Sequence, residues 1–179
     1  MKLNFKKIGD GKPLLILHGL FGSSDNWGTL GKKFSENNLV YLIDLRNHGR
    51  SPHSQEMNYD LMADDLLELI EDENINSPII LGHSMGGKVA LLFAEKYPKY
   101  LDKLIVADIG IKAYPMHHNE ILKGLNSINL HEISSRNQAQ ESIQVHVDNL
   151  GIQQFLLKNL YWIEKGKLAW RMNLKEIEK

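Results

Sequence analysis

One serine of this chain stands in a context that could make it a nucleophile. Residues 82–86 read Gly-His-Ser-Met-Gly, which matches the pattern G-x-S-x-G centred on Ser84. A serine hydroxyl attacks a carbonyl carbon only when a base removes its proton, and this pattern places the serine on a sharp, accessible turn. Glycines flank the serine because side chains at Gly82 and Gly86 would collide with the neighbouring strand and helix. The chemistry indicated is acyl transfer.

The segments on either side of Ser84 are those that such a turn requires. Residues 78–81 form a short apolar run typical of a buried strand, and residues 88–97 form a helical run that stops at Pro98. A helix that begins at the turn directs its N-terminal N–H groups at the site, which favours developing negative charge. The backbone N–H of Met85 is therefore predicted to be one donor of an oxyanion hole.

The rest of the chain predicts strands that alternate with helices, and then helices alone. We expect strands over residues 3–8, 14–17, 39–43, 78–81 and 104–107, with helices near 25–34, 59–71 and 88–97. In the helix over 59–71, Asp65 lies off the apolar stripe. The alternation predicts a mostly parallel, doubly wound α/β sheet. Beyond residue 115 we expect helices near 117–125, 136–147 and 152–160, and then a hairpin about residues 165–167.

Composition excludes several classes of function. The chain has 179 residues and a net charge of −1, so nothing favours nucleic acid or an anionic membrane surface as a partner. It has no cysteine, which excludes disulfides, thiol catalysis and thiolate metal sites. We find no metal-ligand spacing, dinucleotide fingerprint or phosphate-binding loop, so no metal or cofactor is predicted. Without a signal peptide or a membrane-spanning run, the expected location is the cytoplasm.

Taken together, the motifs resemble the α/β-hydrolase family, in particular the small bacterial esterases that also act on acyl thioesters. The resemblance rests on segments 18–23, 25–27, 44–51, 82–88, 106–109 and 153–160. It implies an α/β-hydrolase fold with a core and nucleophile turn over residues 1–113. A helical cap over residues 114–160 and a return toward the core over residues 161–179 would follow.

The resemblance also implies roles for individual residues. Ser84 matches the nucleophile, and the backbone N–H groups of Leu20 and Met85 match the oxyanion-hole donors, with Phe21 as the neighbouring candidate for the first. Asp108 matches the acid that orients a catalytic histidine. It follows the strand next to that of Ser84, at the carboxyl edge where ligands bind in open α/β sheets. The alternative for Asp108 is a capping or turn aspartate.

A catalytic histidine is what the sequence does not supply. Family members carry it after two further strands, whereas no histidine follows His146 here, so the resemblance implies a C-terminally truncated chain that lacks the last strands. The histidines present are expected to be structural or on the surface: His18, His48, His53, His83, His117, His118, His131 and His146. A triad without one member keeps only about 10³–10⁴-fold acceleration over water. The strand over 104–107 would also become an exposed edge through which the chain self-associates.

The function predicted is that of a serine hydrolase acting on a small-molecule carboxylic ester or acyl thioester through an acyl-enzyme. We expect this chain alone to be weak or inactive, because the histidine base is missing. The alternative is a non-catalytic module that binds a ligand or a partner on the same fold, since fold does not fix function. Other chemistries known on such a fold also stay open: a cofactor-free haloperoxidase or perhydrolase, a C–C hydrolase and a lyase.

Overall fold

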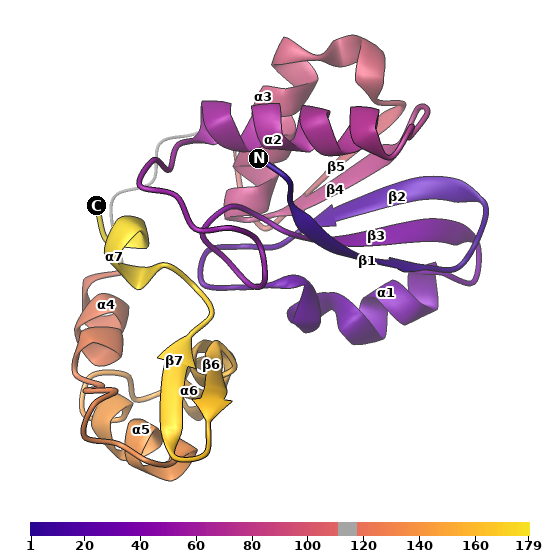
Figure 1. Ribbon diagram of the computed structural model, residues 1–179. Coiled ribbons are helices and arrows are strands. Elements are labelled where there is room, and N and C mark those ends of the chain that lie inside the picture. The colour runs from indigo at the N-terminus through magenta and orange to yellow at the C-terminus, as the bar shows by residue number, and fades with distance from the viewer. Residues whose placement is uncertain (111–117) are drawn as a thin grey trace. The chain divides into compact units, whose positions relative to one another are not determined.

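The computed structural model covers residues 1–179 and describes residues 1–110 and 118–179 (Figure 1). It divides the chain into two compact units, Met1–Ile111 and Lys112–Lys179. The expected residue His117 lies outside the described residues. No helix that the structure describes is long and apolar enough to cross a membrane.

The first unit is built on a five-stranded sheet with the strand order β1-β3-β2-β4-β5. The strands are β1 (Asn4–Ile8), β2 (Lys12–Leu17), β3 (Asn38–Asp44), β4 (Ile79–His83) and β5 (Lys103–Ala107). β1 pairs with β3 in the antiparallel direction, and the other three pairs are parallel. The prediction of a mostly parallel α/β sheet is confirmed.

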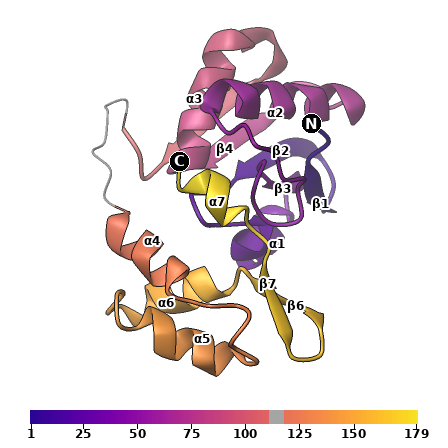
Figure 2. The same cartoon turned by 60° about the vertical axis from the view of Figure 1, so that its left-hand side comes forward.

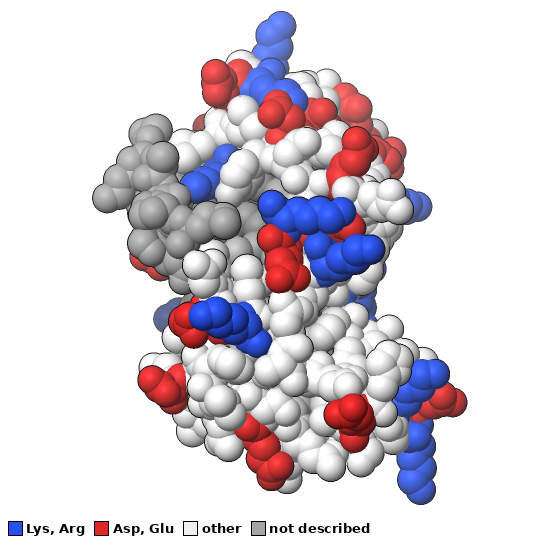
Figure 3. Space-filling view, turned by 90° about the vertical axis from the view of Figure 1, so that its left-hand side faces the viewer, with Lys and Arg blue, Asp and Glu red and all other residues white. Residues whose placement is uncertain are grey.

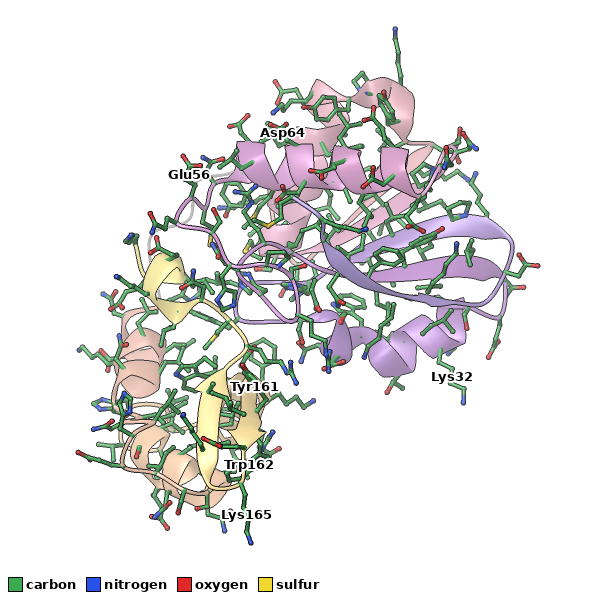
Figure 4. All side chains as sticks on the ribbon, viewed as in Figure 1. Lys32, Glu56, Asp64, Tyr161, Trp162 and Lys165 are labelled. Carbon is green, nitrogen blue, oxygen red and sulfur yellow. The ribbon has the colours of Figure 1, made fainter. Side chains whose placement is uncertain are left out.

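Helices cover both faces of this sheet. The 3-10 turn η1 (Ser24–Trp27) and α1 (Gly28–Phe34) lie on one face, whereas α2 (Tyr59–Asp72) and α3 (Met85–Lys96) lie on the other (Figure 1). A second 3-10 turn, η2 (Pro98–Tyr100), follows α3. Lys32 on α1 and Asp64 on α2, both exposed, point to solvent on opposite sides (Figure 4). The sheet is therefore doubly wound, as expected.

Alternation along the strands explains the two apolar layers. Leu15 and Tyr41 pack toward α2 and α3, whereas Leu14 and Leu42 pack toward α1 on the other face. Because both faces are covered, the central strands are continuous apolar runs rather than alternating ones. β5 lies at the edge of the sheet, and Ile105 on it is 45% exposed. The expected exposed edge is present, and self-association through it stays a prediction.

The second unit contains helices and one hairpin (Figure 2). Its elements are α4 (Asn119–Asn126), α5 (Arg136–Ile143), α6 (Leu150–Leu157), β6 (Leu160–Glu164), β7 (Lys167–Trp170) and α7 (Leu174–Ile177). The expected hairpin is confirmed, with Gly166 at φ 80° in its turn. α5 ends four residues earlier than predicted. The side chain of Asn149 then caps α6 by accepting the N–H of Ile152 at 3.1 Å.

Charged side chains of the two signs are mixed on one face of the molecule. On the face that Figure 3 shows, Lys and Arg lie interspersed with Asp and Glu.

One prediction about a charged residue was wrong. Asp65 was expected to lie off the apolar stripe of α2, but it is buried, with 2% of its surface exposed. Its carboxylate accepts two hydrogen bonds from the Arg46 guanidinium, at 2.6 and 2.8 Å. Burial of Asp65 depends on Arg46, which comes from another part of the chain.

Candidate active site

Ser84 occupies the turn between β4 and α3 in a strained backbone conformation. Its φ is 51° and its ψ is −116°, which a residue with a side chain rarely adopts. The Ser84 N–H donates to Ala107 O at 3.0 Å, and the Gly86 N–H donates to His18 O at 3.1 Å. These bonds tie the turn to the ends of the two strands that flank β4. The surrounding structure thus holds Ser84 where local preference would not.

The glycines of the motif are required by space. A Cβ on Gly82 would lie 2.2 Å from Gly86 O, and a Cβ on Gly86 would lie 2.5 Å from Leu17 O. Real Cβ atoms do not come so close to backbone oxygens, so a side chain at either place would force the turn apart. The collision expected from the sequence is confirmed.

Two backbone N–H groups near Ser84 are available to a ligand. Met85 is the first residue of α3, and Leu20 lies in the loop after β2. Among the described residues, neither N–H donates a hydrogen bond. The loop passes directly against the turn that carries Ser84, since a Cβ on Gly19 would lie 3.2 Å from Ser84 Cβ. Free N–H groups beside a serine are the arrangement that stabilises an oxyanion.

Asp108 directly follows β5, next to the turn that carries Ser84. His83 of β4 pairs in register with Ala107, so Asp108 is one residue beyond this pair. Its φ is 56°, which makes it another strained residue at this edge of the sheet. Its side chain is 87% exposed, and its Oδ2 lies 3.6 Å from His83 Nε2. The sequence did not predict this contact.

The buried histidines of the first unit are not placed to act as bases. Both nitrogens of His18 are occupied: Nδ1 bonds Gly19 O at 2.8 Å, and Nε2 accepts the Leu45 N–H at 3.0 Å. Burial lowers the pKa of His18. Burial also lowers the pKa of His48 to about 3, to which the nearby His18 adds. Both rings therefore stay neutral and enclosed, as expected for structural histidines.

The remaining histidines of the first unit lie at the surface or beside the turn. His53 is exposed. The His83 ring is 40% exposed and faces the edge of Trp27, with ring centroids 6.1 Å apart. Within the part of the chain that the structure describes, no histidine nitrogen hydrogen-bonds to Ser84 Oγ. The first unit thus brings together a serine, two free N–H groups and a carboxylate, without a base between them.

The loop after β3 is more buried than a polar sequence suggests. The Asp44 carboxylate accepts the N–H of Ser24 at 2.6 Å, the N–H of Arg50 at 3.0 Å and the side-chain amide of Asn4 at 2.8 Å. Sequence reasoning noted this loop only as part of the resemblance. Its density of hydrogen-bonding residues was the available signal, because polar groups in a loop are buried only when they bond one another.

The described residues contain no group of three or more His, Asp or Glu side chains that could hold a metal ion.

Residues 12–128 match the family model of the alpha/beta hydrolase fold. Esterase YbfF of Escherichia coli is 34% identical over 180 residues, which is 97% of this chain and 69% of that protein. The sn-1-specific diacylglycerol lipase ABHD11 of Danio rerio is 36% identical over 181 residues, 97% of this chain and 57% of that protein.

A solved structure is also similar over nearly the whole chain. A marine microorganism esterase superposes with a TM-score of 0.95 at 43% identity, covering 99% of this chain and 70% of that one. The chain spans 51% to 69% of the lengths of curated relatives from Haemophilus influenzae, Danio rerio and Escherichia coli.

Proposed function

Because this chain belongs to the α/β-hydrolase fold family, we propose that Ser84 is the nucleophile of a serine hydrolase that cleaves carboxylic esters or acyl thioesters. The observation that carries the proposal is the strained Ser84 turn, which lies against the loop that carries the free Leu20 N–H. The relatives named esterase and diacylglycerol lipase support an ester as substrate.

The reaction proceeds in two steps. Ser84 Oγ attacks the acyl carbon while a base takes its proton. The carbonyl oxygen becomes an oxyanion, which accepts hydrogen bonds from the backbone N–H groups of Leu20 and Met85. The bond from carbon to oxygen or sulfur breaks, and the leaving alcohol or thiol takes the proton from the base. Water then attacks the acyl-enzyme, the acid leaves and Ser84 regains its proton.

We place the base outside the first unit. His18 and His48 are enclosed and hydrogen-bonded, and the exposed Asp108 carboxylate is free to orient an imidazole that comes from elsewhere. With no base in position, the oxyanion hole and substrate binding alone give about 10³–10⁴-fold acceleration over water. The chain by itself is therefore a weak or inactive hydrolase.

The test measures p-nitrophenyl ester hydrolysis, from acetate to decanoate, with and without added imidazole. Free imidazole replaces the missing base, so it should raise turnover in the wild type and not in Ser84→Ala. A fluorophosphonate probe should add its mass to the wild type alone. A folded chain that neither reacts with the probe nor responds to imidazole would contradict the proposal and favour a ligand-binding module.

A further inference from the structure

His18 is a buried residue that contacts three segments of the candidate site. Its ring bonds Gly19 O and the Leu45 N–H, and its own carbonyl oxygen accepts the Gly86 N–H. We propose that His18 is a positioning residue, whose Nδ1–H fixes the Gly19–Leu20 peptide so that the Leu20 N–H faces the site. This inference rests on the proposed function, because the fixed N–H is its oxyanion donor.

The orientation of one peptide plane carries the argument. Gly19 O accepts two hydrogen bonds, from His18 Nδ1 at 2.8 Å and from the Gly22 N–H at 2.9 Å. In a trans peptide the carbonyl and the N–H point in opposite directions. Two donors on Gly19 O therefore direct the Leu20 N–H away from both of them. That N–H has no acceptor among the described residues, which leaves it for a ligand.

The loop needs such an anchor because its own turn is strained. The bond from Gly22 N–H to Gly19 O closes a four-residue turn, and Phe21 within it has φ 59°. A bulky residue rarely adopts this region of backbone space, so the turn would relax if nothing held it. His18 supplies a hold from outside the turn, since its Nε2 is bonded to the end of β3 through Leu45.

Only one protonation form of the ring satisfies both contacts. Because the Leu45 N–H donates to Nε2, that nitrogen must carry a lone pair, and the proton must then reside on Nδ1, facing Gly19 O. A cationic ring would set two N–H donors against each other at Leu45. The titratable groups near the ring are Asp44, His48 and His83. Burial of the ring keeps it in the neutral form.

Two substitutions separate the contacts of the ring. In His18→Asn, the side-chain amide reaches the place of Nδ1 and keeps a donor for Gly19 O. In His18→Gln, the longer side chain reaches the place of Nε2 and keeps an acceptor for Leu45 but loses the donor for Gly19. Asn has one methylene fewer than Gln, so His18→Asn leaves the larger space in the core. A purely structural role predicts that His18→Asn is at least as damaging as His18→Gln, whereas the proposal predicts that His18→Gln damages the oxyanion hole more.

The readout is the binding of n-butylboronic acid. Its boron bonds the serine oxygen while the serine proton passes to the buffer, and the tetrahedral boronate that results places an anionic oxygen in an oxyanion hole. In the wild type, the amide resonances of Leu20 and Met85 should both shift, and Ser84→Ala should abolish the response. In His18→Asn both should still shift. In His18→Gln only Met85 should shift, and binding should weaken by about 10²-fold, as for loss of one donor.

The outcomes separate this inference from the proposed function. A wild type that responds no more than Ser84→Ala would overturn both. A wild type that responds, with a normal Leu20 shift in His18→Gln or equal losses in the two variants, would overturn the inference alone. If a variant does not fold, long-range ¹H–¹⁵N correlation on the wild type decides. A proton on Nδ1 at pH 7 supports the role of His18, and a proton on Nε2 overturns it.

Discussion

Asp44 and Asp108 occupy similar positions relative to the sheet. Asp44 is the last residue of β3, and Asp108 directly follows β5. Asp44 is fully buried, and its carboxylate accepts hydrogen bonds from Asn4, Ser24 and Arg50. The side chain of Asp108 is 87% exposed, with His83 at 3.6 Å. The Asp44 carboxylate is held by protein donors, whereas most of the Asp108 side chain faces solvent.

The difference shows what position in a strand does and does not decide. Both residues lie at the edge of the sheet where ligands bind in this class of fold. Backbone N–H groups from η1 and from the loop after β3 donate to Asp44, whereas no N–H group among residues 1–110 and 118–179 is recorded as a donor to the Asp108 carboxylate. The place of an aspartate at the end of a strand therefore does not decide whether its carboxylate is enclosed by protein donors or exposed.

The largest expected effect is the loss of stability when the enclosed Asp44 carboxylate is replaced. Asp44→Asn replaces a charged acceptor with an amide whose NH₂ faces other donors, so it should lower the free energy of unfolding by about 3 kcal/mol. Urea unfolding of the first unit measures this loss. A loss below about 1 kcal/mol would mean that the bonds to Ser24 and Arg50 contribute little, and the contrast with Asp108 would fail.

Substitution of Gly49, which packs against the Asp44 carboxylate, tests the same enclosure. A Cβ on Gly49 would lie 2.2 Å from Asp44 Cγ, and the residue has φ 55°. Gly166 also has positive φ, 80°, but a Cβ there would meet nothing within 4 Å. Gly166→Ala should therefore cost about 1 kcal/mol from backbone strain alone, and Gly49→Ala about 2 kcal/mol more from overpacking. Equal losses of unfolding free energy would contradict the close approach to Asp44.

The buried loop should also make stability depend on pH. An unfolded histidine titrates near 6.5, whereas burial lowers the pKa of His48 to about 3. Below pH 6.5 the unfolded chain therefore binds a proton that the folded chain does not. Stability is fully present above that pH and falls as the pH drops toward 3, by up to about 1.4 kcal/mol per pH unit for this residue.

The check compares urea midpoints from pH 7 to pH 4 in His48→Gln and in His53→Gln. His48 is buried and His53 is exposed, so the first substitution should flatten the dependence and the second should leave it steep. The buried His18, whose pKa is also lowered by burial, should keep part of the slope in both variants. Parallel curves for the wild type and His48→Gln would contradict a neutral, buried His48.

The smallest expected effect is at the exposed aspartate. Asp108→Asn keeps a residue type that tolerates positive φ and removes only a solvated charge, so the free energy of unfolding should change by less than about 0.5 kcal/mol. Thermal and urea unfolding beside Asp44→Asn give the direct comparison. A loss as large as that of Asp44→Asn would make Asp108 a turn aspartate, the alternative that the sequence left open.

Local patterns predicted much of the fold and part of the candidate site. The apolar runs of β2, β3 and β4, and the glycines around Ser84, follow from short-range requirements of burial and turn geometry. The burial of Asp65 could not be predicted in this way, because its partner Arg46 comes from a loop 19 residues earlier. An acidic residue on a helix is expected to face solvent unless such a partner is known.

The sequence by itself determined the alternation of elements, the glycine-flanked turn at Ser84 and the family to which the chain belongs, since these depend on neighbouring residues. Only the tertiary structure decided that Asp44 is enclosed while Asp108 is open. It also decided that the His18 ring joins Gly19 to Leu45, 27 residues further along the chain. The physical reason is that hydrogen bonds and burial depend on which distant segments converge, and a local pattern carries no record of that convergence.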